Sequence, residues 1–278
     1  SLEEMAPDRE VYAWVDSDGR VTTNWLRNLV APLEEEGVGA VTSFRWYRPE
    51  KGRFITYLLS LWTGYQFCNF YNEKLRATWG GAMAIKRELF EKLPITKKWE
   101  YALADDCILN ECVREAGYKV AFASRSMTSS SSDYSLKDIF IFGVRQMVIG
   151  KFTLPKSWLA SLVSLTVIHT GFGYLFYRLL TRTPFHWTTW GILSFIPASM
   201  VQVLGIIHVV KLWKAQRSDD PLDGDYSWAF LAPIGYTFVW SNLFMSAFFD
   251  RFVWRQIYYR MLTPHETEVY KYSEELLT

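Results

Sequence analysis

The stretch Val11-Tyr-Ala-Trp-Val-Asp-Ser-Asp18 decides the fold class of this chain. It is an apolar run that ends in two carboxylates, Asp16 and Asp18. Such a run predicts a buried strand of the parallel type, and α/β sheets of that type bind ligands at the carboxyl ends of their strands. A divalent cation that bridges carboxylate and phosphate oxygens suits an Asp-x-Asp pair at this place. A solvated turn would use the same residue types, so the pair alone leaves both interpretations open.

Composition indicates a membrane protein with one globular domain. Of the 278 residues, 50% are hydrophobic and 17% aromatic, while the net charge is only +1. This near-neutral balance argues against a nucleic-acid partner. Charged and apolar residues are mixed through 1–150, as in a globular domain, whereas long apolar stretches dominate 157–249. We therefore predict a globular α/β domain over 1–150, a membrane region over 151–262 and a tail over 263–278.

Three apolar stretches are long enough to cross a bilayer, because roughly 20 apolar residues in a helix span the hydrocarbon core. They run over Trp158–Leu180, Trp190–Trp213 and Trp228–Phe249. Tryptophans at their edges are typical of the aromatic belts of membrane helices. Pro233 and Gly235 interrupt the third stretch, which a re-entrant helix or a hairpin would also explain.

The cysteines indicate a reducing compartment. Cys68, Cys107 and Cys112 show no C-x-x-C spacing and no partnering histidine cluster. They fit a reduced cytosolic domain better than a disulfide framework or a zinc site. We expect an integral membrane protein whose globular domain lies on the cytosolic face.

Two further motifs lie in the globular half. Residues 79–85 predict a strand that contains Gly80 and Gly81, and such a glycine pair forms either a bulge or a place where the backbone approaches a ligand closely. Asp105 and Asp106 open a helix predicted over 107–116, where acidic residues ordinarily act as capping groups. An acidic strand end and an acidic helix start can also meet in one cleft, the first holding a metal and the second taking a proton.

The other expected elements follow from periodicity. They are a helix beginning at Trp25, a strand over 37–42 that carries Arg45-Trp46-Tyr47 at its end, a helix over 54–72 and a short helix from Lys86.

The motifs, taken in order, resemble the membrane-embedded inverting glycosyltransferases of family 2, which have the GT-A fold, and are most similar to the ceramide glucosyltransferase group. The ordered set is Val15-Asp16-Ser17-Asp18, Trp79–Ile85, Asp105-Asp106, Phe142-Gly143-Val144-Arg145-Gln146 and the membrane helices. The tail over 251–260 resembles the Trp-Arg-x-x-x-Tyr signature that closes that group.

The resemblance implies roles for the acidic residues. Asp16 and Asp18 match the pair that binds the nucleotide-sugar diphosphate through Mg²⁺ or Mn²⁺, with Asp18 as the more direct metal ligand. Asp106 matches the catalytic base that acts on the acceptor hydroxyl, and Asp105 stands where many members have Glu.

It also implies donor-binding roles for Gly80, Gly81, Asp105, Arg145 and Gln146. The last two match the Arg-Trp end of a (Gln/Arg)-x-x-Arg-Trp motif, in which Phe replaces the first residue and Gln the Trp. Arg145 retains the charge that binds pyrophosphate, whereas the aromatic acceptor-side group is missing.

The expected reaction is transfer of a hexose from a nucleotide sugar, UDP-linked in that family, to a ceramide-like lipid hydroxyl with inversion. The family's first βαβ units, which hold the uridine, precede the Asp-x-Asp strand, and here about ten residues do. We therefore expect a partial GT-A domain that lacks its N-terminal nucleotide-binding part, embeds in membranes and binds nucleotide sugar weakly. A processive polysaccharide synthase and a truncated, inactive remnant are the alternatives.

Overall fold

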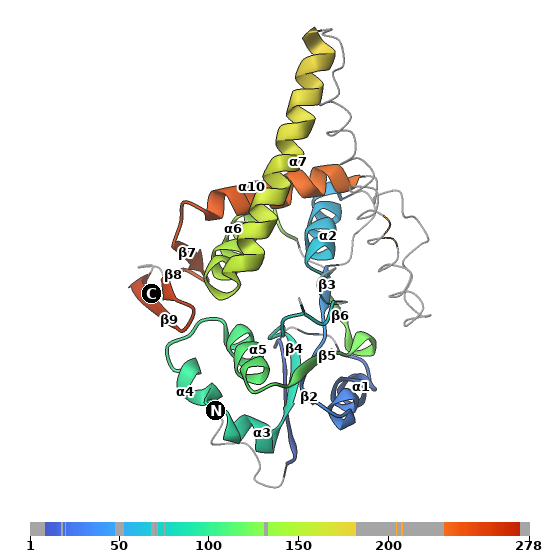
Figure 1. Cartoon of the computed structure of the whole chain (residues 1–278), viewed down its shortest axis with the longest axis vertical. Helices are drawn as coiled ribbons and strands as arrows, with labels where there is room; N and C mark the ends of the chain where they lie inside the picture. The colour runs from blue at the N-terminus through green and yellow to red at the C-terminus, as the bar shows by residue number, and fades with distance from the viewer. Residues whose placement is uncertain are drawn as a thin grey trace. The chain divides into compact units, whose positions relative to one another are not determined.

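A computed structural model of the chain describes residues 9–17, 19, 21–47, 53–67, 70, 72–74, 76–130, 133–181, 204, 207 and 231–272. The chain divides into two compact units (Figure 1). The first comprises Ser1–Arg48, Gln66–Ser132 and Val253–Thr278, and the second comprises Pro49–Tyr65 and Asp133–Phe252. Each unit is described separately.

A four-stranded sheet forms the centre of the first unit. Its order is β1 (Val11–Val15), β4 (Ala82–Lys86), β2 (Val38–Thr42) and β5 (Lys119–Phe122). The β2 and β5 strands pair in parallel, whereas β4 is antiparallel to both β1 and β2. The first, second and fifth strands therefore run in one direction and β4 runs against them. The expectation of parallel pairing for residues 11–18 was wrong for the neighbour β4, and the strand ends at Val15.

Helices cover both faces of this sheet (Figure 1). Successive side chains of a strand point to opposite faces of its sheet. In β4, Met83 and Ile85 belong to the apolar cluster on one face, while Ala82 and Ala84 belong to the cluster on the other. The helices of the first cluster are α3 (Arg87–Lys92), α4 (Ile95–Trp99) and α5 (Asp105–Glu115), and those of the second are α1 (Trp25–Val30) and the 3₁₀ turn η2 (Ala31–Glu34). The predicted α/β class is confirmed.

The remaining strands among the described residues form two smaller sheets. The prediction that residues 45–47 extend β2 was wrong, because they form a separate strand, β3 (Arg45–Tyr47). This strand pairs in parallel with β6 (Thr128–Ser130), which follows the 3₁₀ turn η4 (Ser124–Ser126). The third sheet has the order β7 (Arg251–Trp254), β8 (Ile257–Thr263) and β9 (Glu266–Tyr272). The region predicted as a tail thus contains an ordered strand.

The second unit is helical. It contains α6 (Leu136–Thr153), α7 (Pro155–Thr181) and α10 (Ala232–Ser246), together with most of α2 (Phe54–Phe67). The buried Asn242 links three of them, since its Oδ1 accepts a hydrogen bond from Trp62 Nε1 at 3.1 Å and its Nδ2 lies 3.5 Å from the Phe140 carbonyl. Lys151 Nζ donates to the carbonyls of Ser246 and Phe249, where α10 ends.

The predicted membrane spans have different outcomes. The first corresponds to α7, the one helix among the described residues that is long and apolar enough to cross a membrane, and only 11% of its apolar window is buried within the chain. The second, Trp190–Trp213, lies almost entirely outside the described residues. The third is the shorter helix α10, whose buried residues pack on the helices beside it, so its apolar composition serves contacts within the chain.

The C-terminal hairpin β8–β9 is attached to helix α5 of the first unit. His265 Nε2 lies 2.9 and 3.0 Å from the two carboxylate oxygens of Glu111, and Lys98 Nζ lies 2.6 Å from Glu111 Oε1. The Thr267 amide donates to the Tyr101 carbonyl at 2.9 Å. Burial raises the pKa of Glu111, but the hydrogen bonds from Lys98 and His265 outweigh it and hold that pKa below its usual value.

We expect Glu111→Gln to lower the free energy of unfolding by about 1 kcal/mol at pH 7, after allowance for solvent screening. A carboxyl whose folded pKa is depressed stabilises the fold above its unfolded pKa and loses that effect as pH falls through the folded one. The difference from wild type should therefore shrink below about pH 4. Chemical denaturation at both pH values measures it. Glu115→Gln is the control, because Glu115 is exposed and its ion pair among the described residues is with Lys98, at 3.2 Å. Equal losses in the two variants at pH 7 would contradict the prediction.

Candidate active site

The site begins where the reversed strand β4 meets the end of β1. Val15 pairs with Ala82 in the antiparallel register, which places Asp16 opposite Gly81. The Asp16 amide donates to the Gly81 carbonyl at 3.3 Å. Gly80 and Gly81 lie in a turn before β4. The prediction that they lie within the strand was wrong. The turn and the end of β1 therefore share one edge of the sheet.

Gly81 has no room for a side chain. A Cβ built there would overlap the ring of Trp79 and lie 2.5 Å from Asp16 Oδ2. Trp79 is itself held in place, because its amide donates to Thr42 Oγ1 at 2.9 Å. The indole and the carboxylate of Asp16 thus both contact the backbone of this turn, which explains the second glycine.

The start of α5 brings two more carboxylates to the glycine turn. Asp106 Oδ2 accepts a hydrogen bond from the Gly80 amide at 3.0 Å, and its Oδ1 accepts one from the Cys107 amide at 2.7 Å. Asp105 Oδ1 accepts from the Asp106 amide at 2.9 Å. The N-cap residue Ala104 has no side-chain acceptor, so both aspartates take part in capping. Capping does not account for the bond to Gly80, which lies outside the helix.

The surroundings raise the pKa of both carboxyl groups. Burial raises the pKa of Asp106 to about 6, and the charge of Asp105 adds to the shift, while hydrogen bonds from Gly80 and Cys107 oppose it. Burial likewise raises the pKa of Asp105, and the charge of Asp16 contributes. Asp16, Asp105 and Asp106 therefore form one interacting group. A carboxylate with a pKa near 6 is mostly ionised at pH 7 and still basic enough to accept a proton.

Arg45 joins this site, although no role was predicted for it. Its Nη1 lies 3.1 Å from Asp16 Oδ2, and its Nε donates to Ser130 Oγ at 2.7 Å. Its guanidinium lies 5.3 Å from the ring centroid of Tyr47. The Arg45 side chain is 13% exposed and that of Asp16 41%. Its position soon after β2, at the same sheet edge as Asp16, is the signal that could have found it.

The remaining predicted residues lie elsewhere. Asp18 is outside the described residues. Arg145 and Gln146 lie in the middle of α6, in the second unit, which is described separately. The Arg145 guanidinium lies 5.3 Å from the ring of Phe142, and that ring stacks at 6.5 Å on Tyr134. An aromatic group thus adjoins Arg145 even though the motif's Trp is replaced.

The donor atoms at the site suit a hard divalent cation. Asp16 and Asp105 supply carboxylate oxygens close enough for their charges to interact, and a cation would relieve this repulsion. Among the described residues, however, no three His, Cys, Asp or Glu side chains form a group that could hold a metal ion. The expected metal site therefore depends on Asp18, and metal binding stays a prediction.

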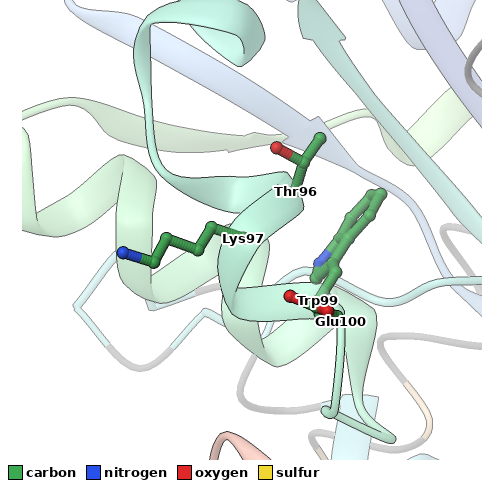
Figure 2. A pocket seen from close by; sticks show the side chains of 4 residues that line it. All are labelled: Thr96, Lys97, Trp99 and Glu100. Atoms are coloured by element: carbon green, nitrogen blue, oxygen red, sulfur yellow. The ribbon is translucent and has the colours of Figure 1, made fainter.

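A shallow, open pocket lies beside α4, lined by Thr96, Lys97, Trp99 and Glu100 (Figure 2). The side chains of Lys97 and Trp99 extend to opposite sides of the helix. None of the four lining residues was predicted to take part in the site. Trp99 nevertheless reaches the start of α5, since its Nε1 donates to the Asp105 carbonyl at 2.8 Å.

The sequence profile of Glycosyl transferase family 21 matches residues 8–266, which include the carboxylates, the glycine turn and Arg45. The family number differs from the family 2 expected from the motifs, but family 21 is the ceramide glucosyltransferase family, the group to which the motifs are most similar. A search of curated proteins found no match.

Proposed function

The chain belongs to glycosyltransferase family 21, and from this premise we propose that it transfers a hexose from a nucleotide-diphosphate sugar, UDP-linked, to the hydroxyl of a ceramide-like lipid with inversion. The glycosyltransferase activity follows from the family. The observation that carries the mechanism is the carboxylate of Asp106, which lies 3.0 Å from the Gly80 amide and has a pKa raised to about 6.

In the proposed reaction Asp106 removes the proton of the acceptor hydroxyl while that oxygen attacks the anomeric carbon. The attacking oxygen enters on the face opposite the departing diphosphate, so a single displacement inverts the centre. Gly81 lets the ring of Trp79 and the carboxylate of Asp16 both pack against the turn whose Gly80 amide donates to Asp106. The guanidinium of Arg45 supplies positive charge at Asp16, and Arg145 is proposed to bind pyrophosphate as its motif implies.

A divalent cation is part of the proposal. Asp16 and Asp18 would hold Mg²⁺ or Mn²⁺, which when bound would offset the negative charge of the diphosphate. The oxygen donors of Asp16 and Asp105 and their mutual repulsion support this assignment.

The lipid acceptor is supported by α7. This helix is 27 residues long and apolar enough to cross a membrane, and its exposed residues include Leu159, Val163, Val167, Phe176 and Leu180. An exposed apolar helix of this length suits a bilayer, which would also hold the tails of a lipid acceptor. We propose an integral membrane protein with its catalytic unit on the cytosolic face; the two described cysteines, Cys107 and Cys112, are free thiols, which is compatible with a reducing compartment.

The test is a transfer assay with membranes from cells that express the complete gene. Radiolabelled UDP-glucose and UDP-galactose are each supplied with ceramide, with a total lipid extract or without lipid. We expect label in a glycolipid whose anomeric configuration, determined by NMR, is opposite to that of the donor. Label in a long, lipid-free polymer would favour the polysaccharide synthase, and no transfer to any acceptor would favour the inactive remnant.

We expect Asp18→Ala to weaken Mn²⁺-dependent binding of the nucleotide sugar by at least about tenfold, because the cation loses a carboxylate ligand. Calorimetric titration with Mn²⁺ and with a chelator measures the effect. Asp133→Ala is the control, since Asp133 is exposed and pairs with Arg53, and both residues belong to the second unit. An unchanged metal dependence in Asp18→Ala would show that the Asp-x-Asp segment is an ordinary turn.

A further inference from the structure

Trp99, the last residue of α4, connects two parts of the catalytic unit that carry carboxylates. Its indole Nε1 donates a hydrogen bond of 2.8 Å to the backbone carbonyl of Asp105. The same peptide plane contains the amide of Asp106, which donates to Asp105 Oδ1 at 2.9 Å. Both ends of this peptide are therefore held, and the direction of the Asp106 side chain follows from its orientation.

The ring of Trp99 also packs against the strand that leads to Asp16. It meets Trp14 edge-on, with ring centroids 5.8 Å apart at an interplanar angle of 82°. Phe90 of α3 packs against both rings, at 5.4 Å from Trp99 and 5.7 Å from Trp14. Trp14 lies on β1 two residues before Asp16, so a shift of the aromatic group would move the end of that strand.

We propose that Trp99 is a positioning residue for the transfer reaction, one that fixes the start of α5, and with it the carboxylate of Asp106, relative to Asp16. The inference rests on the proposed function, because it assigns the reason why the two carboxylates must keep a fixed spacing. The capping groups nearby do not duplicate this bond, because the carboxylates of Asp105 and Asp106 accept from the first amides of the helix, whereas the indole donates to a carbonyl.

The hydrogen bond can be separated from the packing. Trp99→Phe keeps an aromatic ring against Trp14 and Phe90 but removes the donor to the Asp105 carbonyl. Misplacing a catalytic group by about 1 Å costs on the order of 100-fold in rate. We expect kcat to fall by about 10- to 100-fold, while KM for the nucleotide sugar stays within a few fold because the donor-binding groups remain in place.

Trp25→Phe is the matched control. Trp25 is buried on α1, which packs on the other face of the sheet, and its Nε1 donates to the Ser126 carbonyl at 2.7 Å. Both variants therefore lose one indole bond to a main-chain carbonyl within the same unit. A purely structural effect would lower thermal stability and activity together in both variants, whereas positioning would lower kcat in Trp99→Phe alone.

Amide hydrogen exchange gives a readout that does not need activity. The amides of Asp106 and Cys107 should exchange faster in Trp99→Phe than in the wild type and in Trp25→Phe. Exchange at wild-type rates, or a kcat equal to that of the wild type, would overturn the inference, as would an equal loss of kcat in the control. If the wild type transfers no sugar but Trp99→Phe still accelerates exchange at these two amides, the proposed function fails and the positioning contact stands.

Discussion

Asp106→Asn is expected to lower the turnover number of sugar transfer by about 10²- to 10⁴-fold, the usual contribution of a catalytic base, while nucleotide-sugar binding stays within a few fold. The amide keeps the shape of the side chain, and its one oxygen can still accept one of the two backbone hydrogen bonds, from Gly80 or from Cys107. It cannot take up the proton of the acceptor hydroxyl. Transfer assays and donor titrations on membranes from the complete gene measure the two quantities.

The pH dependence tests the same role. Because burial raises the pKa of Asp106 to about 6, wild-type turnover should fall as pH drops through 6 and the base becomes protonated, and Asp106→Asn should lose this limb. The folded pKa also lies above the unfolded value of about 4, so ionisation of Asp106 destabilises the fold as pH rises from 4 to 6. Asp106→Asn escapes this destabilisation at pH 7 but loses one of the two backbone hydrogen bonds that the carboxylate accepts. Turnover near the wild-type level would remove Asp106 from the role of base.

Gly81→Ala is expected to reduce transfer by about 100-fold, the cost of displacing catalytic groups by about 1 Å, and to lower the free energy of unfolding by about 1 to 3 kcal/mol. The added methyl group would overlap the ring of Trp79 and lie 2.5 Å from Asp16 Oδ2. Neither neighbour can yield freely, since Trp79 is tied to Thr42 and the carboxylate of Asp16 to Arg45. Thermal denaturation and the transfer assay together measure the effect.

The adjacent glycine provides the comparison. A Cβ at Gly80 would meet its nearest atom, Asp105 Oδ1, at 3.4 Å, which is an ordinary contact. Gly80→Ala should therefore keep a stability close to that of the wild type. If Gly80→Ala and Gly81→Ala lose equal stability, the close approach of Trp79 and Asp16 is not what requires the second glycine.

The α/β class and the meeting of the two acidic motifs could be predicted from the sequence. An apolar strand that ends at Asp16 and a helix that begins at Asp105 suffice for that expectation, because strand ends and helix starts gather at one edge of a sheet. The direction of β4 could not be predicted, since an apolar run reads alike in parallel and antiparallel pairing once both faces are covered. Arg45 could have been found, because it follows β2, which runs in the same direction as β1 and ends at the same edge of the sheet as Asp16.

The helical part shows a different limit of sequence patterns. A helix that is apolar on all sides is buried either in protein or in lipid. The apolar sequences of α7 and of the region around α10 therefore each predicted a membrane span. Only the contacts separate them: α7 leaves most of its surface uncovered, whereas α10 buries Tyr236, Val239 and Leu243 against its neighbours.

The attachment of the β8–β9 hairpin to α5 has a consequence for biosynthesis. Residues 257–272 leave the ribosome after the apolar helices α7 and α10, yet His265 binds Glu111 of the helix that begins with the catalytic carboxylates. Proteins are made from the N-terminus, so this contact cannot form until the apolar helices have been synthesised. The helix that bears Asp106 therefore acquires its contact with His265 only after the apolar helices have left the ribosome. If those helices insert into a bilayer as they emerge, the catalytic unit would be completed at the membrane.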